Sequence, residues 1–302
     1  MTLPQISPIL PGSPIAWIGL GTMGSPMAQR LAQAGYPVSG FNRTSHERLS
    51  SLPVSLASTP AEAIRECRLI IIMVRDAKST RSLFEDPGGI LGALSPGQIL
   101  VNMSTESPEE AKGEAAWCAQ KGVLYFDIPV SGSVIPAQKG ELLLLGGGEE
   151  AHRPLIAGPM AILGKGLHWF GPAGSGMAAK LAINLLLAAH MKALAETLLV
   201  GEDLGLDPKE LGAALLDSPL ATPFYRIKIP ALLRSDYTKA FSSSLMKKDL
   251  DLLLSELLSS GKFLPETLTA TQALYHRIVA GGAGEKDLSI LFSRLKSDSQ
   301  GR

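Results

Sequence analysis

The sequence predicts an α/β fold in which a doubly wound, mostly parallel sheet is joined by a long helix to an all-helical second part. Three observations predict this fold. An apolar segment at residues 15–18 runs directly into a glycine-rich turn. Short apolar segments then alternate with helix-like ones as far as residue 170, which is typical of βαβ units. Beyond residue 177 only helical periodicity remains.

The first 14 residues contain four prolines and no lysine or arginine. They therefore lack the charged start and the sustained apolar stretch of a secretory signal. We expect residues 1–14 to form a flexible N-terminal arm.

The first strand delivers three glycines in the spacing of a dinucleotide-binding turn. Gly19 suits a tight turn, Gly21 allows the backbone to approach a pyrophosphate, and Gly24 allows the next helix to pack closely against the strand. The N-terminal amides and positive dipole end of that helix would then face the phosphates. Gly35 is a plausible left-handed cap at the end of this helix. The spacing predicts a Rossmann-type fold with a nucleotide at the turn.

The second strand ends at Asn42, Arg43 and Thr44. An NAD site places an Asp or Glu about 20 residues after the glycines to hold the ribose hydroxyls. This chain has Asn42 and a cation there instead, which favours the 2′-phosphate of NADP(H). A solvated arginine after an edge turn remains the alternative reading of Arg43.

Later elements complete the sheet and then a helical domain. The strand candidates are residues 69–74, 99–102, 124–126, 142–145 and 166–170, with a covering helix at 109–120. The helix candidates of the second part are residues 177–204, 208–216, 245–259 and 268–279. We therefore expect an NADP-binding domain at 15–174 and an all-helical substrate and oligomerisation domain at 175–302. The long helix is apolar on most of its circumference, which predicts a homodimer or homotetramer.

The composition argues against several classes of protein, namely those that bind nucleic acid, membranes or metals and those built on disulfides. The chain has 302 residues, of which 45% are hydrophobic, and its 28 basic residues equal its 28 acidic residues. This balance supplies no broad cationic field, so no nucleic-acid or membrane partner is expected. Two cysteines and five scattered histidines give neither a disulfide framework nor a metal pattern. We expect a cytoplasmic protein without a metal.

Lys180 and Asn184 are one helical turn apart in a run of apolar residues. The lysine can extend its ammonium along the helix to solvent, or it can be a buried acid that protonates an oxygen as hydride reaches a carbonyl carbon. Ser131 and Gly132 follow a strand at the sheet's ligand edge, where a hydroxyl and glycine amides can hold a carboxylate. An ordinary turn is the alternative there.

Taken together, four ordered motifs resemble the β-hydroxyacid dehydrogenase family, and the resemblance extends from Ile15 to Phe292. The motifs are Gly19-Leu20-Gly21-Thr22-Met23-Gly24, Asp127-Ile128-Pro129-Val130-Ser131-Gly132, Gly174-Ser175-Gly176 through Lys180 to Asn184, and Lys248-Asp249-Leu250.

The resemblance implies a role for each matching residue. Lys180 would be the catalytic acid, with Asn184 beside it. Substrate contacts would come from Ser131, Gly132, Ser133, Phe241 and Asp249. Cofactor contacts would come from Gly19, Leu20, Gly21, Thr22, Met23, Gly24, Asn42, Arg43, Thr44, Met73, Val74, Thr105 and Lys248.

Within the family, Ser133 and the Asn42-Arg43-Thr44 run look most like the NADPH-dependent glyoxylate and succinic semialdehyde reductases. The chain departs from that branch at Val134-Ile135, where lysines are common, and at Met73-Val74-Arg75-Asp76, where relatives often have a proline. The alternatives are a 3-hydroxyisobutyrate or tartronate semialdehyde type enzyme, an imine reductase on the same fold, or a non-catalytic NADP-binding scaffold.

Overall fold

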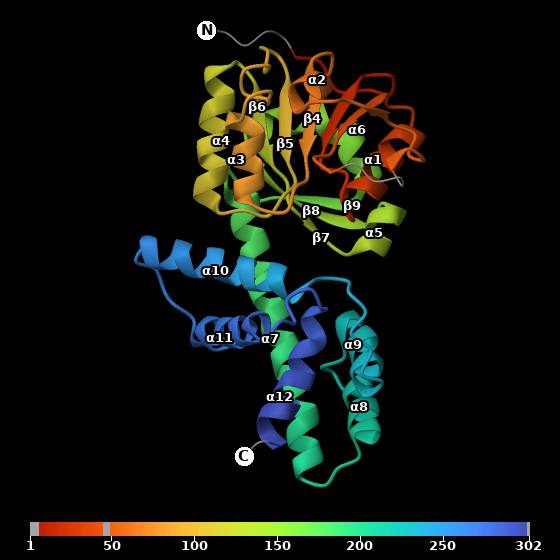
Figure 1. Cartoon of the computed structure of the whole chain (residues 1–302), viewed down its shortest axis with the longest axis vertical. Coiled ribbons are helices and arrows are strands. Elements are labelled where there is room, and N and C mark those ends of the chain that lie inside the picture. Colours follow the sequence, from red (N-terminus) through yellow and green to blue (C-terminus); the bar gives the residue numbers. More distant parts are fainter. Residues whose placement is uncertain (1–5, 45–48, 301–302) are drawn as a thin grey trace. The chain divides into compact units, whose positions relative to one another are not determined.

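The structure, a computed structural model, describes residues 6–44 and 49–300 of the chain (Figure 1). Nine strands form its sheet: β1 Ile15–Ile18, β2 Val38–Phe41, β3 Ser55–Leu56, β4 Leu69–Ile72, β5 Ile99–Asn102, β6 Leu124–Asp127, β7 Val130–Ser131, β8 Leu142–Gly148 and β9 Gly164–Trp169.

The strand order is β3-β2-β1-β4-β5-β6-β8-β7, with β9 paired to β8. Strands β1 to β6 are parallel to one another, in the order of a doubly wound sheet. The chain order reverses beside β1, so the carboxyl ends of β1, β2 and β4 lie together at one edge. Strand β8 runs antiparallel to β6 and to β7, and parallel to β9. The prediction of a mostly parallel sheet is confirmed.

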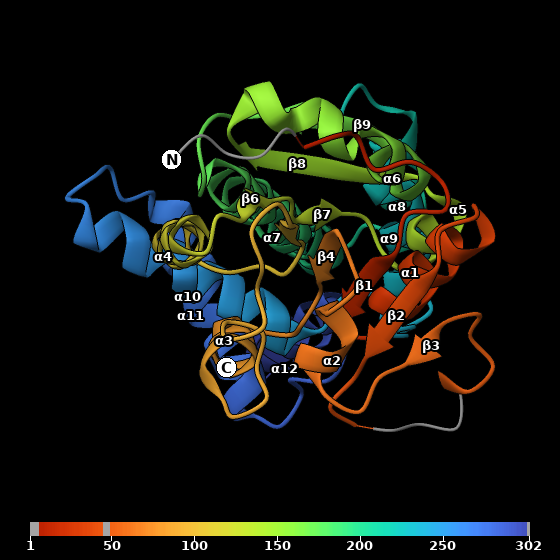
Figure 2. The same cartoon turned by 90° about the horizontal axis from the view of Figure 1, so that it is seen from above.

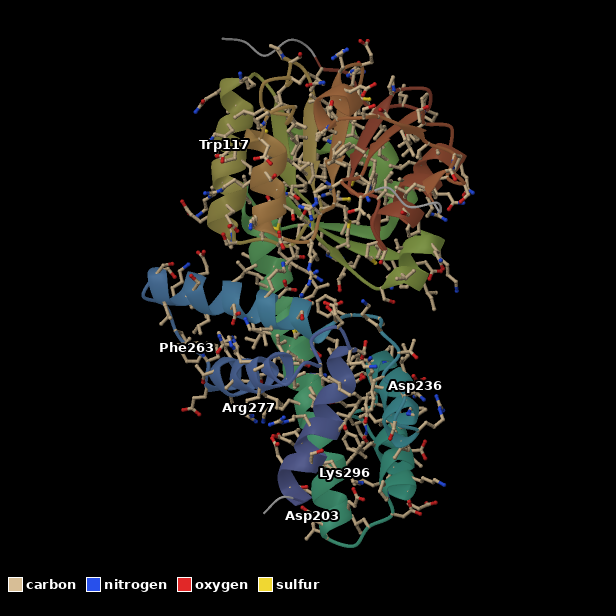
Figure 3. All side chains as sticks on the ribbon, viewed as in Figure 1. Trp117, Asp203, Asp236, Phe263, Arg277 and Lys296 are labelled. Carbon is tan, nitrogen blue, oxygen red and sulfur yellow. The ribbon has the colours of Figure 1, made fainter. Side chains whose placement is uncertain are left out.

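Helices cover both faces of this sheet. They are α1 Gly24–Gln33, α2 Pro60–Ile64, α3 Ala77–Glu85, α4 Pro108–Gln120, α5 Val134–Lys139 and α6 Ala157–Leu163, with a 3-10 segment, η2, at Glu150–Ile156. One buried cluster joins α1, α5 and α6 to the first face, and a second joins α2, α3 and α4 to the other (Figure 2). Each central strand is buried on both faces, which explains its uninterrupted apolar run. Trp117 of α4, labelled in Figure 3, packs its ring 5.4 Å from the ring of Phe84 on α3.

The expected N-terminal arm is only partly correct. Residues 1–5 lie outside the described residues, but Ile9 is 1% exposed, and its N–H donates to the carbonyl of Leu155. The N–H of Gly12 donates to the carbonyl of Gly35. The apolar side chain of Ile9 belongs to the buried cluster with α1 and α6, whereas Leu10, Pro11 and Gly12 are exposed.

The second part of the chain is helical in the described residues. Its helices are α7 Ser175–Asp203, α8 Pro208–Asp217, α9 Pro223–Leu233, α10 Ser243–Ser259, α11 Glu266–Ala280 and α12 Leu291–Gln300, with a 3-10 turn, η3, at Leu288–Ile290. The sequence analysis missed α9 and α12. Helix α9 contains Pro230 and is apolar without a clear periodicity, and α12 is a short helix with only three apolar residues among polar ones.

The chain divides into two compact units, residues 1–180 and 181–302. The N-terminal unit contains the sheet and the start of α7. The C-terminal unit packs its own core from α7, α9, α10, α11 and α12. At its surface, Lys296 of α12 forms an ion pair with Glu202 of α7 at 2.7 Å; Lys296 and the neighbouring Asp203 are labelled in Figure 3.

Helix α7 is long and apolar enough to cross a membrane by length and composition, although the core helix of a soluble protein passes the same test. One third of its most apolar window is buried within the structure. Much of the apolar surface of α7 is therefore left uncovered within a single chain.

Candidate active site

The glycine turn lies between β1 and α1, at the carboxyl edge of the sheet. Gly19 has φ +102, and a Cβ there would lie 2.1 Å from the Met73 carbonyl oxygen. A Cβ on Gly24 would lie 1.9 Å from the Gly19 carbonyl oxygen. A Cβ on Gly21 would meet no described atom within 4 Å. Two of the glycines therefore allow close packing of the backbone, while the third borders open space.

A cavity of about 380 Å³ opens beside this turn. It is lined by Gly19 and Gly21, by Asn42, Arg43 and Thr44 after β2, and by Met73, Val74 and Arg75 after β4. Predicted cofactor residues from three separate segments thus border one space. It lies at the strand ends where ligands of doubly wound sheets bind. Of the other residues predicted in the turn, Leu20 is buried, Thr22 is exposed and Met23 is partly buried.

Asn42 is held by hydrogen bonds at both ends of its amide. Its Oδ1 accepts from the N–H of Leu20 at 3.0 Å, and its Nδ2 donates to the carbonyl of Thr44 at 2.6 Å. An aspartate could accept the first bond but could not donate the second. Arg43 is exposed beside it. Over the described residues 42–44, the end of β2 therefore presents an amide, a cation and a hydroxyl, and no carboxylate.

Two further turns form the same edge of the sheet. The N–H of Val74, after β4, donates to Ser104 Oγ at 3.0 Å, and the N–H of Ser104, after β5, donates to Asn102 Oδ1 at 2.9 Å. Asp76 caps α3 by accepting from the N–H of Ser79 at 2.9 Å. Thr105 is partly buried in the second turn. Ser104, to which the sequence analysis gave no role, ties the two turns together.

The predicted substrate segment begins in β7. Ser131 ends this short strand and is partly buried, Gly132 is exposed at φ +138, and Ser133 precedes α5. A Cβ on Gly132 would lie 2.8 Å from a methyl carbon of Leu142. The positive φ and the close packing both require glycine beside the serine hydroxyl.

The first turns of α7 place Lys180 in the N-terminal unit. Its residue is 9% exposed, so the lysine is buried. Asp127, at the end of β6, anchors this helix start. Its Oδ1 accepts from the N–H of Gly174 at 2.9 Å and its Oδ2 from the N–H of Met177 at 2.8 Å.

Burial raises the pKa of Asp127 to about 6, against the lowering effect of these backbone hydrogen bonds. Asp127 is part of the second family motif, but no role was predicted for it from the sequence. A polar residue directly after an apolar strand was the available signal.

The remaining predicted residues lie in the C-terminal unit. Asn184 is 1% exposed, and its Nδ2 donates to Asp249 Oδ2 at 2.6 Å. Lys248 Nζ lies 3.0 Å from Asp249 Oδ1. Phe241 is partly buried just before α10, and its N–H donates to Asp287 Oδ2 at 3.1 Å. The structure thus joins Asn184, Asp249 and Lys248 in one polar group.

Within the described residues, no group of three or more His, Cys, Asp or Glu side chains is arranged to hold a metal ion. One of the five histidines, His46, lies outside those residues.

Comparison with known proteins places these features in a family. Residues 14–171 match the NAD-binding domain of 6-phosphogluconate dehydrogenase, and residues 174–295 match the NAD-binding domain of NADP-dependent 3-hydroxyisobutyrate dehydrogenase. Glyoxylate/succinic semialdehyde reductase 2 of Arabidopsis thaliana is 31% identical over 94% of this chain and 79% of its own length. The 2-hydroxy-3-oxopropionate reductase of Escherichia coli is 31% identical over 93% of this chain and 97% of its own length.

Among solved structures, 3-hydroxyisobutyrate dehydrogenase of Mycobacterium tuberculosis, determined with L-serine, superposes with a TM-score of 0.83 at 27% identity. The match covers 94% of this chain and 99% of that one. The two domain matches, the relatives and the shared fold agree with the four motifs. The chain belongs to the β-hydroxyacid dehydrogenase family and is an oxidoreductase that uses a nicotinamide dinucleotide.

Proposed function

We propose that the protein is an NADPH-dependent reductase of small aldehyde acids, such as glyoxylate and succinic semialdehyde, with Lys180 as the proton donor. The burial of Lys180 is the observation that carries the proposal. Burial of a lysine ammonium is costly and therefore uncommon, and it is a recognised way of tuning a lysine for proton transfer. This one lies in the second turn of a helix whose start is hydrogen-bonded to the strand that leads to Ser131.

The preference for NADPH rests on the end of β2. The position after β2 that holds the ribose hydroxyls in an NAD site is occupied by Asn42, whose amide is engaged in hydrogen bonds at both ends. Arg43 and Thr44 border the cavity and offer a guanidinium and a hydroxyl to a 2′-phosphate.

The reaction requires a held carboxylate and a delivered proton. Ser131 Oγ and the backbone amides of Gly132 and Ser133 would bind the substrate carboxylate. When bound, NADPH supplies hydride to the carbonyl carbon. Lys180 Nζ then donates its proton to the carbonyl oxygen as negative charge develops there, giving the hydroxy acid.

The family resemblance implies further roles for Asn184, Phe241 and Lys248. Asn184 would orient Lys180 or the new hydroxyl, and its hydrogen bond to Asp249 fixes its amide. Phe241 would shape the substrate pocket, and Lys248 would lie near the nicotinamide.

The test of the reaction is NADPH oxidation measured with glyoxylate, succinic semialdehyde, tartronate semialdehyde and methylmalonate semialdehyde. Lys180→Ala should lower kcat by about 10²- to 10⁴-fold while NADPH still binds, because a positioned proton donor contributes roughly that much. Lys165→Ala, at an exposed lysine of β9, is the matched control. Near-normal kcat in Lys180→Ala would refute the role. Cofactor binding by the wild type without oxidation of any substrate would favour the scaffold alternative.

A second variant tests the cofactor preference. Arg43→Asp should raise the KM for NADPH and reduce the preference for NADPH over NADH. Arg65→Asp, an exposed arginine that does not line the cavity, should leave the preference unchanged. An unchanged preference in Arg43→Asp would remove Arg43 from the 2′-phosphate site.

We also propose that the enzyme is a homodimer or homotetramer assembled through α7. Exposed, mostly apolar side chains recur along one side of this helix at Ala178, Ala182, Leu186, Ala193 and Val200. Leu186 is 58% exposed and Val200 56% exposed. Light scattering should give an oligomer at micromolar concentration and a smaller species for Leu186→Glu. A monomeric wild type would contradict the proposal.

A further inference from the structure

Five buried polar side chains lie directly behind the two turns after β4 and β5. They come from five separate segments: Thr80 from α3, Asn102 from β5, Glu106 from the β5–α4 turn, Glu114 from α4 and Tyr125 from β6. Thr80, Asn102 and Glu106 are fully buried, Glu114 is 4% exposed and Tyr125 is 7% exposed. Burying two carboxyl groups together carries a large desolvation penalty. The cluster therefore requires a physical explanation.

Neutral donors satisfy part of this cluster. Asn102 Nδ2 donates to Glu106 Oε1 at 3.2 Å and to Glu114 Oε2 at 2.8 Å. The Tyr125 hydroxyl also donates to Glu114 Oε2 at 2.8 Å, and the Thr80 hydroxyl donates to Glu106 Oε1. Glu106 Oε2 is buried without a donor among the described groups. One carboxylate oxygen of the Glu106–Glu114 pair therefore lacks a donor.

A proton on Glu114 accounts for the leftover acceptor. Burial and the negative charge of Glu106 raise the pKa of Glu114 well above its ordinary value. Of the two carboxyls, Glu114 is therefore the one that burial favours in the protonated form, and it is hydrogen-bonded to Glu106. The other side chains that act on Glu114 are Asn102 and Tyr125, and neither carries a positive charge. A proton shared by the pair would take the place of the missing cation.

This proton is linked through hydrogen bonds to the turns at the cofactor edge. Asn102 donates to both carboxyls with its Nδ2 and accepts from the N–H of Ser104 with its Oδ1. Ser104 Oγ in turn accepts from the N–H of Val74. Thr80 lies in the first turn of α3, the helix that follows Val74. A change in the carboxyl pair would therefore reach both turns.

We propose that Glu106 and Glu114 are positioning residues for the nicotinamide cofactor, and that the proton they share keeps the turns carrying Val74 and Thr105 in the conformation that binds it. The inference rests on the proposed function, because it assigns a task to the same cofactor site. Loss of the proton would leave two adjacent buried anions, whose repulsion would separate Glu106 from Glu114 and move the β5–α4 turn.

Other titratable groups face the pair. Burial raises the pKa of the Tyr125 hydroxyl and of the Cys118 thiol on α4, and the negative charge of Glu114 raises both further. Both groups therefore stay neutral between pH 7 and pH 10. Asp127, which acts on Tyr125 from the same strand, has a pKa of about 6 and stays ionised over that range. Tyr125, Cys118 and Asp127 therefore do not contribute to a pH dependence over that range, and a change in Kd would report on the carboxyl pair.

The experiment measures the Kd of the enzyme for NADPH alone, without substrate, from pH 7 to pH 10. Trp17 offers an intrinsic signal, because its Nε1 donates to the carbonyl of Gly19 in the glycine turn. In the wild type, Kd should rise by up to about tenfold per pH unit once the pair has lost its proton, because binding then requires proton uptake.

Glu114→Gln is the decisive variant. Its amide can donate to Glu106 Oε2 and accept from Asn102 and Tyr125, so it imitates the protonated acid and cannot titrate. Its Kd should match the wild type within about twofold at pH 7 and stay flat to pH 10. Glu106→Gln is a second variant that should also flatten the profile, in case Glu114→Gln fails to fold. Glu109→Gln, at an exposed carboxyl near the start of α4, should keep the wild-type profile.

The outcomes separate the two proposals. A merely structural role for the pair would lower the melting temperature of Glu114→Gln and leave the pH dependence of Kd as in the wild type, which would overturn this inference. A wild-type Kd that is constant from pH 7 to pH 10 would also overturn it. Absence of NADPH binding at every pH would refute the proposed function, and this inference with it.

Discussion

The two units of the chain bury carboxyl groups in opposite ways. In the N-terminal unit, Glu114 is buried beside the carboxyl of Glu106, with neutral hydrogen-bond donors around it, and Asp127 accepts from backbone amides. In the C-terminal unit, the fully buried Asp287 accepts from Lys228 Nζ at 2.5 Å and from Ser289, Ala240 and Phe241. The contrast shows that an acid buried with a cation stays charged, whereas an acid buried without one moves its titration toward neutral pH.

The pKa values of these buried acids are shifted in opposite directions in the two units. Burial raises the pKa of Glu114 and of Asp127 above their ordinary values. Burial also acts to raise the pKa of Asp287, but hydrogen bonds from Lys228 and Ser289 and the charge of Lys228 lower it overall. The N-terminal unit, which contains the glycine turn, is therefore the unit with carboxyl groups that respond near neutral pH.

The largest expected effect comes from removing the cation of the C-terminal unit. Lys228→Met leaves the Asp287 carboxylate buried without its counter-charge and should lower the free energy of unfolding by about 3 to 5 kcal/mol. Denaturant unfolding followed by far-UV circular dichroism measures it. Lys239→Met, in the exposed pair with Glu285, should cost at most about 1 kcal/mol. Equal losses in the two variants would contradict the contrast between the units.

The next effect tests the anchor of the N-terminal unit. Asp127→Ala leaves the N–H groups of Gly174 and Met177 without their acceptor and should cost about 2 to 4 kcal/mol, because each buried unsatisfied donor costs about 1 to 3 kcal/mol. All three tryptophans, Trp17, Trp117 and Trp169, lie in residues 1–180, so their fluorescence follows this unit. Thr59→Ala, which removes an N-cap of α2, should cost about 1 kcal/mol. A smaller loss in Asp127→Ala than in Thr59→Ala would show that Asp127 is not an anchor.

The contributions of Asp127 and Asp287 to the free energy of unfolding should change with pH in opposite directions. The pKa of Asp127 rises from 3.8 to about 6 on folding, so its contribution to stability is full below about pH 4 and falls as the pH rises to about 6. The change should be about 1 to 3 kcal/mol, measured as wild type minus Asp127→Asn by tryptophan fluorescence.

The C-terminal unit should respond in the other direction. Because the pKa of Asp287 is lowered on folding, its contribution is present above its ordinary pKa and is lost as the pH falls through the folded value. Circular dichroism of wild type against Asp287→Asn measures this difference. The same sign of slope for Asp127 and Asp287 would break the comparison.

The smallest expected effect is at the surface. Lys296→Met removes the pair with Glu202, whose two side chains are 38% and 40% exposed. The free energy of unfolding should change by less than about 1 kcal/mol, and salt should reduce the difference further. A loss comparable to that of Lys228→Met would mean that burial does not decide the strength of these pairs.

The features that were predicted correctly from the sequence are those that depend on the spacing of nearby residues. The glycine turn, the polar end of β2 and the long apolar helix were visible because glycine spacing and apolar periodicity are local patterns. The long helix was expected at residues 177–204 and is found at Ser175–Asp203. The domain division was expected at residue 174, while the compact units divide after residue 180.

Contacts between distant segments could not be predicted in this way. Asp127 meets Met177 from 50 residues away, and Lys228 meets Asp287 from 59 residues away. Glu106 precedes the N-cap of α4 and Glu114 lies in the middle of that helix, where a glutamate is ordinarily solvent-exposed, and only the packing of α3, α4 and β6 buries them. The antiparallel direction of β8 is likewise decided by its pairing partners rather than by its own apolar run.

The anchor at Asp127 has a consequence for redesign of the enzyme. A methyl group on Gly147 would lie 2.5 Å from Asp127 Oδ1, and one on Gly176 would lie 2.4 Å from the carbonyl oxygens of Asp127 and Leu145. The main chain at Gly147 and Gly176 packs directly against Asp127 and Leu145. No neighbouring side chain could be made smaller to provide space for a larger residue there. Variant libraries that seek new substrates should therefore leave Gly147 and Gly176 fixed.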